Sequence, residues 1–221
     1  GSAIFSDNGD VTGTLDWTPA TGDATASPYS VTFTATDNAG AFSQETISIT
    51  VNTAPSGGTL VTSALVPPAN VDLTAEGTSD WVHWGATNPT SLNRKAGVAT
   101  QISDYTLLGG LAPSRYQPPT GLRVTHAWSD GVPTASNSTN AGLFIKPIGN
   151  GYQLTVPADT ANKALRVYLC AWTARGEVQV SLSDGSALPF TTTVENATGV
   201  IDRVINIDFS AASNGQTLTF T

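Results

Sequence analysis

The stretch ALRVYLCAW, residues 164–172, decides the fold class because its side chains alternate between two kinds. Leu165, Val167, Leu169 and Ala171 form one apolar face, whereas the residues between them form a mixed face. Successive side chains of a strand point to opposite sides, so this pattern predicts a strand with its apolar face in the core. A helix would instead group side chains three or four positions apart.

Six further segments of the C-terminal part have the same β character. They are LRVTHAW (122–128), GLFIKPI (142–148), YQLTVPA (152–158), EVQVSLS (177–183), RVINIDFSA (203–211) and QTLTFT (216–221). The turn sequences GNG, SDG and SNG separate several of them. This succession of short strands predicts an antiparallel β-sandwich of the jelly-roll type over residues 71–221.

The composition agrees with an all-β protein and narrows the choice of partners. Of the 221 residues only 12% are charged, Gly (21) and Pro (13) are frequent, and the formal net charge is −8. Nucleic acid and anionic membrane surfaces attract clustered Lys and Arg, so neither is expected as a partner. No membrane-inserting segment is visible. Low charge, acidity and abundant Ser and Thr suggest an extracellular or cell-surface bacterial protein.

Residues 1–53 form a shorter β unit, with strands expected in VTGTLDWTP (11–19), YSVTFTATDNAG (29–40) and ETISITV (45–51). Their inward positions are predicted to be Val11, Leu15, Trp17, Tyr29, Val31, Phe33, Ala35, Ile47, Ile49 and Val51. Residues 54–70 are rich in Gly, Ser and Pro and are expected to form a linker. The chain is thus predicted to have two domains, 1–53 and 71–221.

The pair FSDNGDVTGTLDWTPATG (5–22) and YSVTFTATDNAGAFSQETISITV (29–51) resembles the second half of the immunoglobulin-like and cadherin-like repeats of bacterial surface proteins. The resemblance implies a partial sandwich without its earlier strands. Such a half-domain has an open apolar face and unpaired edges. It is therefore expected to lean on the second unit or on a neighbouring chain, which makes a dimer through this half-domain one expectation.

The second unit resembles the galactose-binding-like jelly rolls of large bacterial secreted proteins. The segments that carry this resemblance are SDWVHWG (79–85), NRKAG (93–97), HAWSDG (126–131), GNGYQLTVPAD (149–159) and LRVYLCAWTARGEVQVSLSDGS (165–186). Modules of this kind are not catalytic, and they bind sugars, peptides or no known ligand. The resemblance therefore implies a fold more firmly than a ligand.

No residue pattern in the sequence indicates an enzyme. The two histidines, His83 and His126, belong to no metal-binding spacing, and nucleophile and phosphate-loop motifs are absent. The single cysteine, Cys170, is expected to be a buried small hydrophobe. We expect no catalytic activity, with an enzyme whose cleft carries no known motif as a remaining alternative.

Carbohydrate recognition needs exposed aromatic rings together with a few polar groups. The mixed face of residues 164–172 offers Arg166, Tyr168 and Trp172, with a strand covered by a loop as the alternative. In the turn WSDG, Trp128 and Asp130 either line the rim of a glycan site or belong to the core and to an Asx turn, respectively.

In SDWVHWG, alternation places Trp81 with His83 on one face and Val82 with Trp84 on the other. We assign Val82 and Trp84 to the core. Trp81 and His83 are then expected to face outward, or into a groove under a loop, as candidate ligand contacts. The alternative for His83 is a hydrogen bond to the backbone beneath that loop.

Calcium is the one cofactor that the sequence suggests. Asp7, Asn8 and Asp10 in SDNGD, with Asp37 in TDNAG, are candidate calcium ligands by resemblance to cadherin-like repeats. One such loop offers too few oxygens for a hard cation, and ordinary Asn and Asp turns are the alternative. Glu76, Asp80 and Asp208 form a second acidic group that could meet near an edge of the jelly-roll sheet.

These features lead to one main functional hypothesis and two alternatives. The main hypothesis is a non-catalytic carbohydrate-binding module of a large extracellular protein, with a polysaccharide or glycan as partner. The first alternative is a structural or adhesive spacer without a small ligand, and the second is the enzyme without a recognisable motif. Open aromatic faces would favour binding, whereas sealed ones would favour the spacer.

Overall fold

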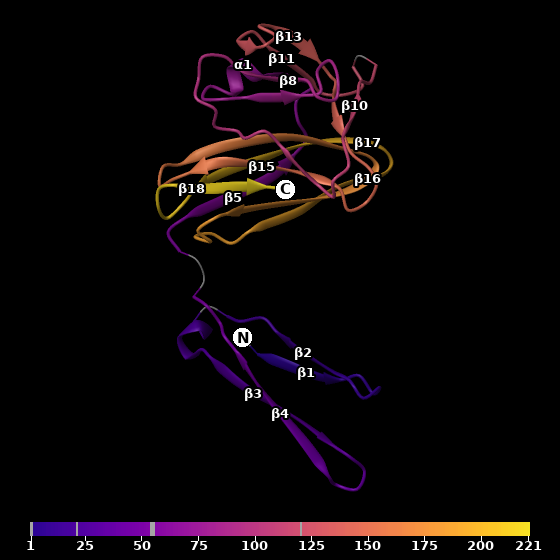
Figure 1. Ribbon diagram of the computed structural model, residues 1–221, viewed down its shortest axis with the longest axis vertical. Helices are drawn as coiled ribbons and strands as arrows, with labels where there is room; N and C mark the ends of the chain where they lie inside the picture. The colour runs from indigo at the N-terminus through magenta and orange to yellow at the C-terminus, as the bar shows by residue number, and fades with distance from the viewer. Residues whose placement is uncertain (1, 21, 54–55, 120) are drawn as a thin grey trace. The chain divides into compact units, whose positions relative to one another are not determined.

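The computed structural model describes residues 2–20, 22–53, 56–119 and 121–221 (Figure 1). They divide into two compact units, Gly1–Pro55 and Ser56–Thr221. Most described residues lie in strands, with one short helix, α1 (Leu73–Glu76), and one 3-10 turn, η1 (Asp23–Ala26). The expectation of an all-β protein is confirmed. Among the described residues, no helix has the length and apolar character needed to cross a membrane.

The first unit consists of two separate two-stranded sheets. Its strands are β1 (Ala3–Asp7), β2 (Gly13–Trp17), β3 (Tyr29–Thr36) and β4 (Phe42–Ile49). β1 pairs with β2 and β3 with β4, both antiparallel. The sequence predicts three strands here and misses β1, whose sequence AIFSD has adjacent apolar residues and no alternation of apolar and polar side chains.

Aromatic pairs connect the strands of the first unit. The ring centroids of Phe5 and Phe33 lie 5.7 Å apart, and those of Trp17 and Tyr29 lie 4.9 Å apart in an edge-on arrangement. No side chain among residues 2–20 and 22–53 is fully buried, however. Four strands in two small sheets leave most of the apolar surface of this unit accessible to water.

Three positions that the sequence places inward in this unit are exposed. Val11 lies outside the strands, between β1 and β2, with a φ of 65°. Ala35 lies on β3 and Ile47 on β4, and both are exposed. The inward assignment is therefore wrong for these three residues.

The largest sheet of the second unit has the strand order β5-β17-β16-β18-β15-β9. These strands are β5 (Thr59–Leu65), β9 (Thr106–Leu108), β15 (Gly151–Ala158), β16 (Lys163–Leu182), β17 (Phe190–Ser210) and β18 (Gln216–Phe220). All neighbouring pairs are antiparallel. The strands predicted at 152–158, 164–172, 177–183, 203–211 and 216–221 all lie in this sheet.

Strand β16 joins two predicted strands into one, with an irregularity in its middle. Its register with β17 shifts between Trp172 and Ala174. Thr173 between them has a φ of 48°, a left-handed conformation that a β-branched residue rarely adopts. Before this point the buried side chains of β16 occupy odd positions, and after it they occupy even positions. The irregularity therefore exchanges the inward and outward faces of the strand.

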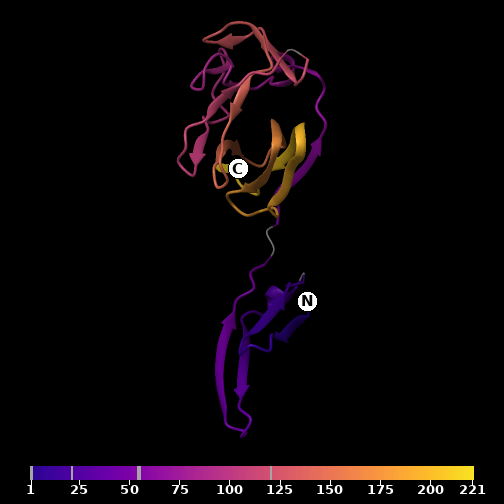
Figure 2. The ribbon, with the colours of Figure 1, turned by 90° about the vertical axis from the view of Figure 1, so that its right-hand side faces the viewer.

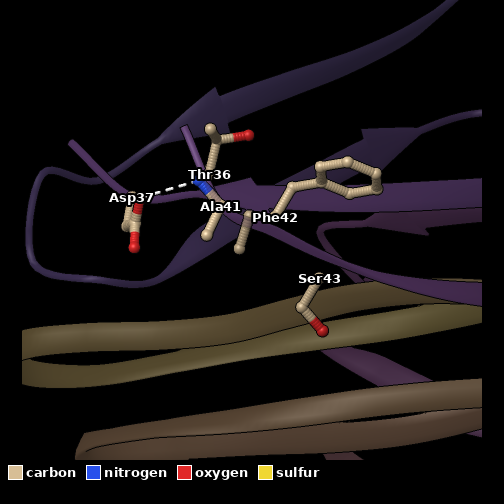
Figure 3. Close-up of a pocket in the computed structure, with 6 residues that line it drawn as sticks. Thr36, Asp37, Ala41, Phe42 and Ser43 are labelled. Carbon is tan, nitrogen blue, oxygen red and sulfur yellow. Dashed lines mark hydrogen bonds between the residues drawn. The ribbon is translucent and has the colours of Figure 1, made fainter. Parts of the chain in front are cut away.

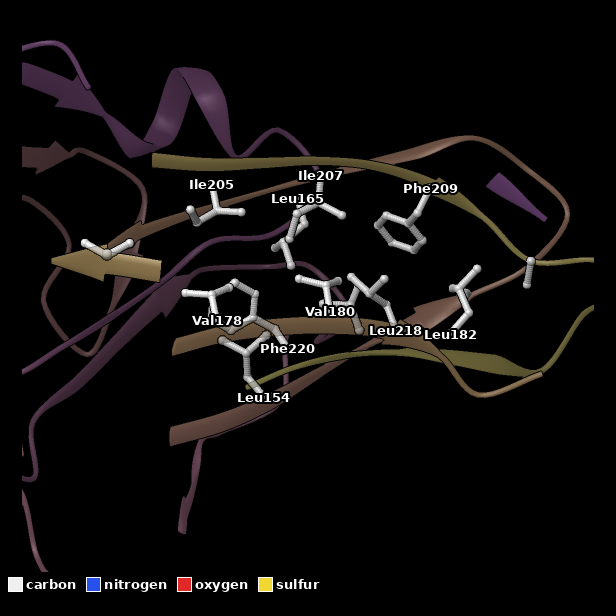
Figure 4. Packing of buried hydrophobic residues seen from close by; sticks show 14 of the residues in the cluster. Leu154, Leu165, Val178, Val180, Leu182, Ile205, Ile207, Phe209, Leu218 and Phe220 are labelled. Atoms are coloured by element: carbon white, nitrogen blue, oxygen red, sulfur yellow. The ribbon is translucent and has the colours of Figure 1, made fainter. Parts of the chain in front are cut away.

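The exchange of faces lets the two halves of the long strands enclose one core. The side chains in Figure 4 point from opposite sides toward one another. On one side are Leu165, Ile205, Ile207 and Phe209, and on the other Val178, Val180, Leu182 and Leu218. Ile205, Ile207, Val180 and Leu218 have no exposed surface, so this is the main hydrophobic core.

Strand β5 lies within the segment that the sequence predicts to be a linker. Thr59–Leu65 pairs antiparallel with β17, and Leu60 packs against the main core. The linker assignment of residues 54–70 is therefore wrong from Thr59 onward. The Gly and Pro residues on either side of β5 favour a linker prediction, and the strand itself has one main inward apolar side chain, Leu60. Positions 54–55 of that assignment lie outside the described residues.

Short strands form a lobe on one side of the large sheet (Figures 1 and 2). They are β6 (Asn70–Asp72), β7 (Val82–Trp84), β8 (Leu92–Lys95), β10 (Ser114–Tyr116), β11 (Thr125–Trp128), β12 (Gly131–Val132), β13 (Asn137–Thr139) and β14 (Gly142–Phe144). They make three small sheets, β13-β11-β6, β12-β8-β7 and β10-β14. β6 and β11 are parallel, so the expected all-antiparallel pairing is wrong at this pair.

Ile207→Ala tests the assignment of the main core. Ile207 has no exposed surface, so its truncation leaves a cavity, and we expect the free energy of unfolding of the second unit to fall by about 2–5 kcal/mol. Leu188→Ala, at an exposed position, is the matched control and should change it by less than about 0.5 kcal/mol. Chemical denaturation measures both; equal effects would contradict this core.

Candidate functional site

Trp81 and His83 lie in the interior of the lobe rather than on its surface. They are 3% and 8% exposed, while Val82 and Trp84 on the opposite face are only partly buried. The outward assignment of Trp81 and His83 is therefore wrong. The lobe has a core of its own around Trp81 and Trp128, and Trp84 packs against the main core, so both faces of this segment are covered.

Asp130 is the acceptor of a network that joins three segments of the lobe. Its Oδ1 accepts hydrogen bonds from Trp81 Nε1 at 2.8 Å and from Thr74 Oγ1 at 2.7 Å. Its Oδ2 pairs with the ammonium group of Lys95. Asp130 is thus neither an Asx-turn residue nor a rim ligand, the two roles weighed from the sequence. Partial burial acts to raise the pKa of Asp130. The hydrogen bonds from Lys95, Thr74 and Trp81 together outweigh this effect, so the pKa of Asp130 is below its usual value.

The two histidines, which are distant in sequence, meet in an aromatic cluster. The ring centroids of His83 and His126 lie 5.7 Å apart, and His126 lies 5.0 Å from Tyr168 in an edge-on arrangement. Trp128 lies 5.4 Å from His83. Trp128 is buried and its Nε1 donates to the carbonyl of Thr134 at 2.9 Å, which removes it from the rim of any site.

The histidine rings are held in their neutral form. Burial, followed by repulsion from His126, lowers the pKa of His83 to about 4. Burial also lowers the pKa of His126 to about 4, against attraction from Asp202 and Glu76 and with repulsion from Arg123. Within the described part of the chain, His83 Nδ1 and both ring nitrogens of His126 have no hydrogen-bond partner. A proton added here would sit in a poorly solvated aromatic environment.

Trp172 is the one tryptophan of the second unit with a largely open ring, 64% exposed. It lies on the outer face of β16, and the ring of Tyr116 lies 5.9 Å from it. The guanidinium of Arg123 lies 5.6 Å from the centre of the Tyr116 ring and makes a two-pronged ion pair with Asp202. We call Trp172, Tyr116, Arg123 and Asp202 the Trp172 platform.

Sequence reasoning found Trp172 but missed its three neighbours. Asp202 faces Cys170 directly across the β16–β17 pair, so the hairpin register could have located it. Tyr116 comes from a segment in which no strand is predicted and Arg123 from the predicted strand 122–128, and no sequence signal places either beside Trp172. Cys170 is exposed on the same outer face, so its expected burial is wrong.

Arg166 and Tyr168, which share the outer face of β16 with Trp172, fasten the lobe to the sheet. Tyr168 Oη donates a hydrogen bond of 2.6 Å to Glu76 Oε2, and Arg166 Nη1 lies 3.2 Å from the same oxygen. Burial and the Glu76 carboxylate raise the pKa of Tyr168. Tyr168 is half-buried against the lobe core, whereas Arg166 remains largely exposed.

The predicted calcium ligands of the first unit form turns instead of one site. Asp7 Oδ1 accepts from the Gly9 backbone N–H at 2.9 Å, and Asp37 Oδ1 accepts from two backbone N–H groups in its own loop. Asp10 likewise accepts from the Thr12 N–H, and Asn8 donates to neighbouring threonines. Across the described ranges, no group of three His, Cys, Asp or Glu side chains has a geometry that could hold a metal ion.

Glu76, Asp80 and Asp208 do not meet. Glu76 binds Tyr168, as described above. Asp80 is buried, and its Oδ2 accepts from the backbone N–H groups of Gln101 and Ile102 at 2.8 and 3.0 Å. Asp208 is exposed near β5. The expectation of a second acidic site is therefore wrong.

The surface of each unit has a concave region. One, of about 380 Å³, lies at the end of the β3–β4 hairpin, where Asp37 accepts the Ala41 N–H beside Phe42 (Figure 3). The other, of about 500 Å³, is the β5 groove, which is lined by Thr59, Val61, Asn162, Lys163, Ala164, Asp208 and Phe209. Neither region includes Trp172, Tyr116, Arg123 or Asp202.

Acid should destabilise the second unit through the two histidines. Because their pKa is near 4 in the folded chain and about 6.5 in the unfolded chain, stability is complete above pH 6.5 and falls as the pH drops toward 4. The expected loss is about 3 kcal/mol for each ring. Urea unfolding between pH 7 and pH 4 measures it. A His83→Phe/His126→Phe variant should show a flatter profile, and an unchanged slope in that variant would contradict this cause.

Asp130→Ala tests the network of the lobe. The substitution leaves the Trp81 indole N–H and the Lys95 ammonium without their acceptor, so we expect a loss of about 1–3 kcal/mol in unfolding free energy. Asp104→Ala removes an exposed carboxylate that pairs with Arg94 and serves as the control, with an expected change below about 0.5 kcal/mol. Similar losses in the two variants would argue against the network.

Comparisons of this chain with protein-family models, with curated proteins and with solved structures find no match. The resemblances noted in the sequence therefore stay expectations. We therefore infer the function from the geometry of the described residues.

Proposed function

We propose that the second unit is a non-catalytic carbohydrate-binding module that stacks a glycan on Trp172. The observation that carries the proposal is the open ring of Trp172, 64% exposed in a unit whose other tryptophans are largely covered. Flat aromatic rings offer an apolar face to the C–H groups of a sugar ring.

The surroundings of Trp172 suit a sugar in two further ways. Trp172 lies on β16 and faces Val200 across the long β16–β17 pair, so the ring is carried by a regular strand rather than by a loop. The Arg123–Asp202 pair supplies N–H donors and carboxylate oxygens close to the aromatic rings, and the two groups hold each other in place. Polar groups fixed in this way can bind sugar hydroxyls with little loss of side-chain freedom.

The proposed site is smaller than the one predicted from the sequence. Burial removes Trp81, His83 and Trp128 from contact with any ligand of the folded chain, and Asp130 is engaged by Trp81, Thr74 and Lys95. Tyr168 is hydrogen-bonded to Glu76, and Arg166 keeps a largely exposed guanidinium but pairs with Glu76, away from Trp172 along β16. An open, shallow platform fits a polysaccharide that binds weakly at each site and gains affinity through repeated modules.

We include the fold family of each unit and the cellular location of the protein in this proposal. The folded-over sheet with its lobe supports a galactose-binding-like jelly roll, and the two small sheets of the first unit support an incomplete immunoglobulin-like or cadherin-like sandwich. The acidic, weakly charged composition supports an extracellular or cell-surface bacterial protein. Glycan binding on Trp172 requires no metal ion.

A structural or adhesive spacer is the second candidate, and one observation favours it. Most of the aromatic side chains that could have formed a site, Trp81 and Trp128 among them, are sealed in the core of the lobe. A spacer needs such a core and no ligand. The exposed Trp172 would then have to serve a contact with another protein.

Titration with a panel of soluble polysaccharides separates the two candidates. We expect saturable binding of one glycan class by calorimetry, and a loss of affinity of tenfold or more in Trp172→Ala, since stacking on the open ring is removed. Leu188→Ala, at another exposed apolar position, should bind as the unmodified chain does. No binding of any glycan, or equal binding by folded Trp172→Ala, would favour the spacer.

A further inference from the structure

Strand β5 forms an edge of the six-stranded sheet that the chain leaves unprotected. It pairs with β17 on one side, and no strand of the described residues lies on its other side. Exposed edges usually carry a charge, a proline or a bulge, because their free backbone groups can pair with another chain. The sequence of β5, TLVTSAL, has no charge and no proline, and its seven residues pair with β17 without a register shift.

The opposite edge of the same sheet is short by comparison. β9 has only three residues, Thr106–Leu108, and two glycines with positive φ, Gly109 and Gly110, follow it. Three residues offer few backbone groups for pairing. β5 is therefore the edge that another strand could extend.

Apolar side chains accompany the free edge of β5. Val61 and Leu65 are 64% and 51% exposed, and Val66, just beyond the strand, is 76% exposed. Val61, Ser63 and Leu65 share the outer face because side chains alternate along a strand. The inner face begins with Leu60, which packs on the main core. This row of exposed apolar groups lies along a strand that is ready to pair.

We propose that β5 pairs antiparallel with β5 of a second copy of this chain, with the two-fold axis at Ser63. Residues that face each other across an antiparallel pair share one side of the sheet. With this axis, Val61 faces Leu65 of the second copy on the outer face, and Leu60 faces its Val66. A two-fold axis makes each of these contacts occur twice.

The side chains select this axis over the neighbouring one. An axis at Thr62 would place Val61 opposite Ser63 and Leu65 opposite Thr59, so that apolar groups would face hydroxyl groups. The axis at Ser63 pairs Val61 with Leu65 on the outer face and Leu60 with Val66 on the inner face, while Thr62 faces the small Ala64 and the two Ser63 hydroxyls face each other. It also brings Leu65 and Val66 of the second copy toward the β5 groove that Thr59 and Val61 border.

Charge favours this edge over the open strands of the first unit as the place of contact. Residues 1–53 contain six acidic residues and no Lys or Arg, so two first units repel each other. The second unit has eleven acidic and nine basic residues. Near β5 the groove contains one residue of each sign, Lys163 and Asp208. Because the whole chain has a net charge of −8, added salt should strengthen the association.

Sedimentation velocity across a range of protein concentrations tests the proposal. We expect a mass that rises with concentration from 22.7 kDa toward twice that value, and a Leu65→Lys variant that stays monomeric. Leu188→Lys places the same charge at another exposed apolar position and should associate normally. A monomer at every concentration would overturn the proposal, as would association that Phe42→Lys on β4 abolishes and Leu65→Lys does not.

A cysteine on the two-fold axis tests the register. In a Cys170→Ser background, Ser63→Cys should form a disulfide-linked dimer rapidly under mild oxidation, because the two Cβ atoms of a facing pair lie about 5 Å apart. Thr59→Cys has no such counterpart in this register and is the matched control. Cross-linking of Ser63→Cys no faster than that of Thr59→Cys would reject the Ser63 axis. Both positions are exposed, so neither substitution disturbs the core.

Discussion

The fold of the second unit depends on the irregularity at Thr173. Without it, a twenty-residue strand would keep its apolar side chains on one face throughout, and the two halves of β16 could not both turn them toward one core. The left-handed φ of 48° at Thr173 costs backbone energy, which the burial of Ile205, Ile207 and Val180 offsets. Trp172 directly precedes this point and points outward, so the same irregularity presents the proposed sugar platform.

Alternation predicted the large sheet well and the lobe poorly, for a physical reason. In β16 one face is apolar and the other mixed, so parity identifies both the strand and its buried side. Around Trp81 and Trp84 both faces are aromatic and both are covered, so parity pairs the residues correctly but cannot tell which face is the interior. The Asp130 network joins residues as many as 56 positions apart, a contact that no local pattern encodes.

The lobe is held to the sheet by a polar and aromatic contact instead of a second large apolar core. Tyr168 stacks edge-on against His126 and donates to Glu76 of the lobe. Three ring nitrogens in this contact have no partner among the described residues, and unpaired buried polar groups weaken packing. The Trp172 platform spans the same two parts of the unit, because Trp172 and Asp202 lie on the sheet and Tyr116 lies on β10 of the lobe.

The two proposals use different parts of the same sheet and are compatible. Pairing at β5 engages its free edge, while Trp172 lies on β16, separated from β5 by β17. Trp172 pairs with Val200, beyond the stretch of β17 that β5 covers, Val204–Ser210. A β5 dimer would therefore leave both platforms open. Two weak sites on one rigid assembly raise the effective concentration of the second site for a long polysaccharide, so dimerisation would strengthen glycan binding without any new sugar contact.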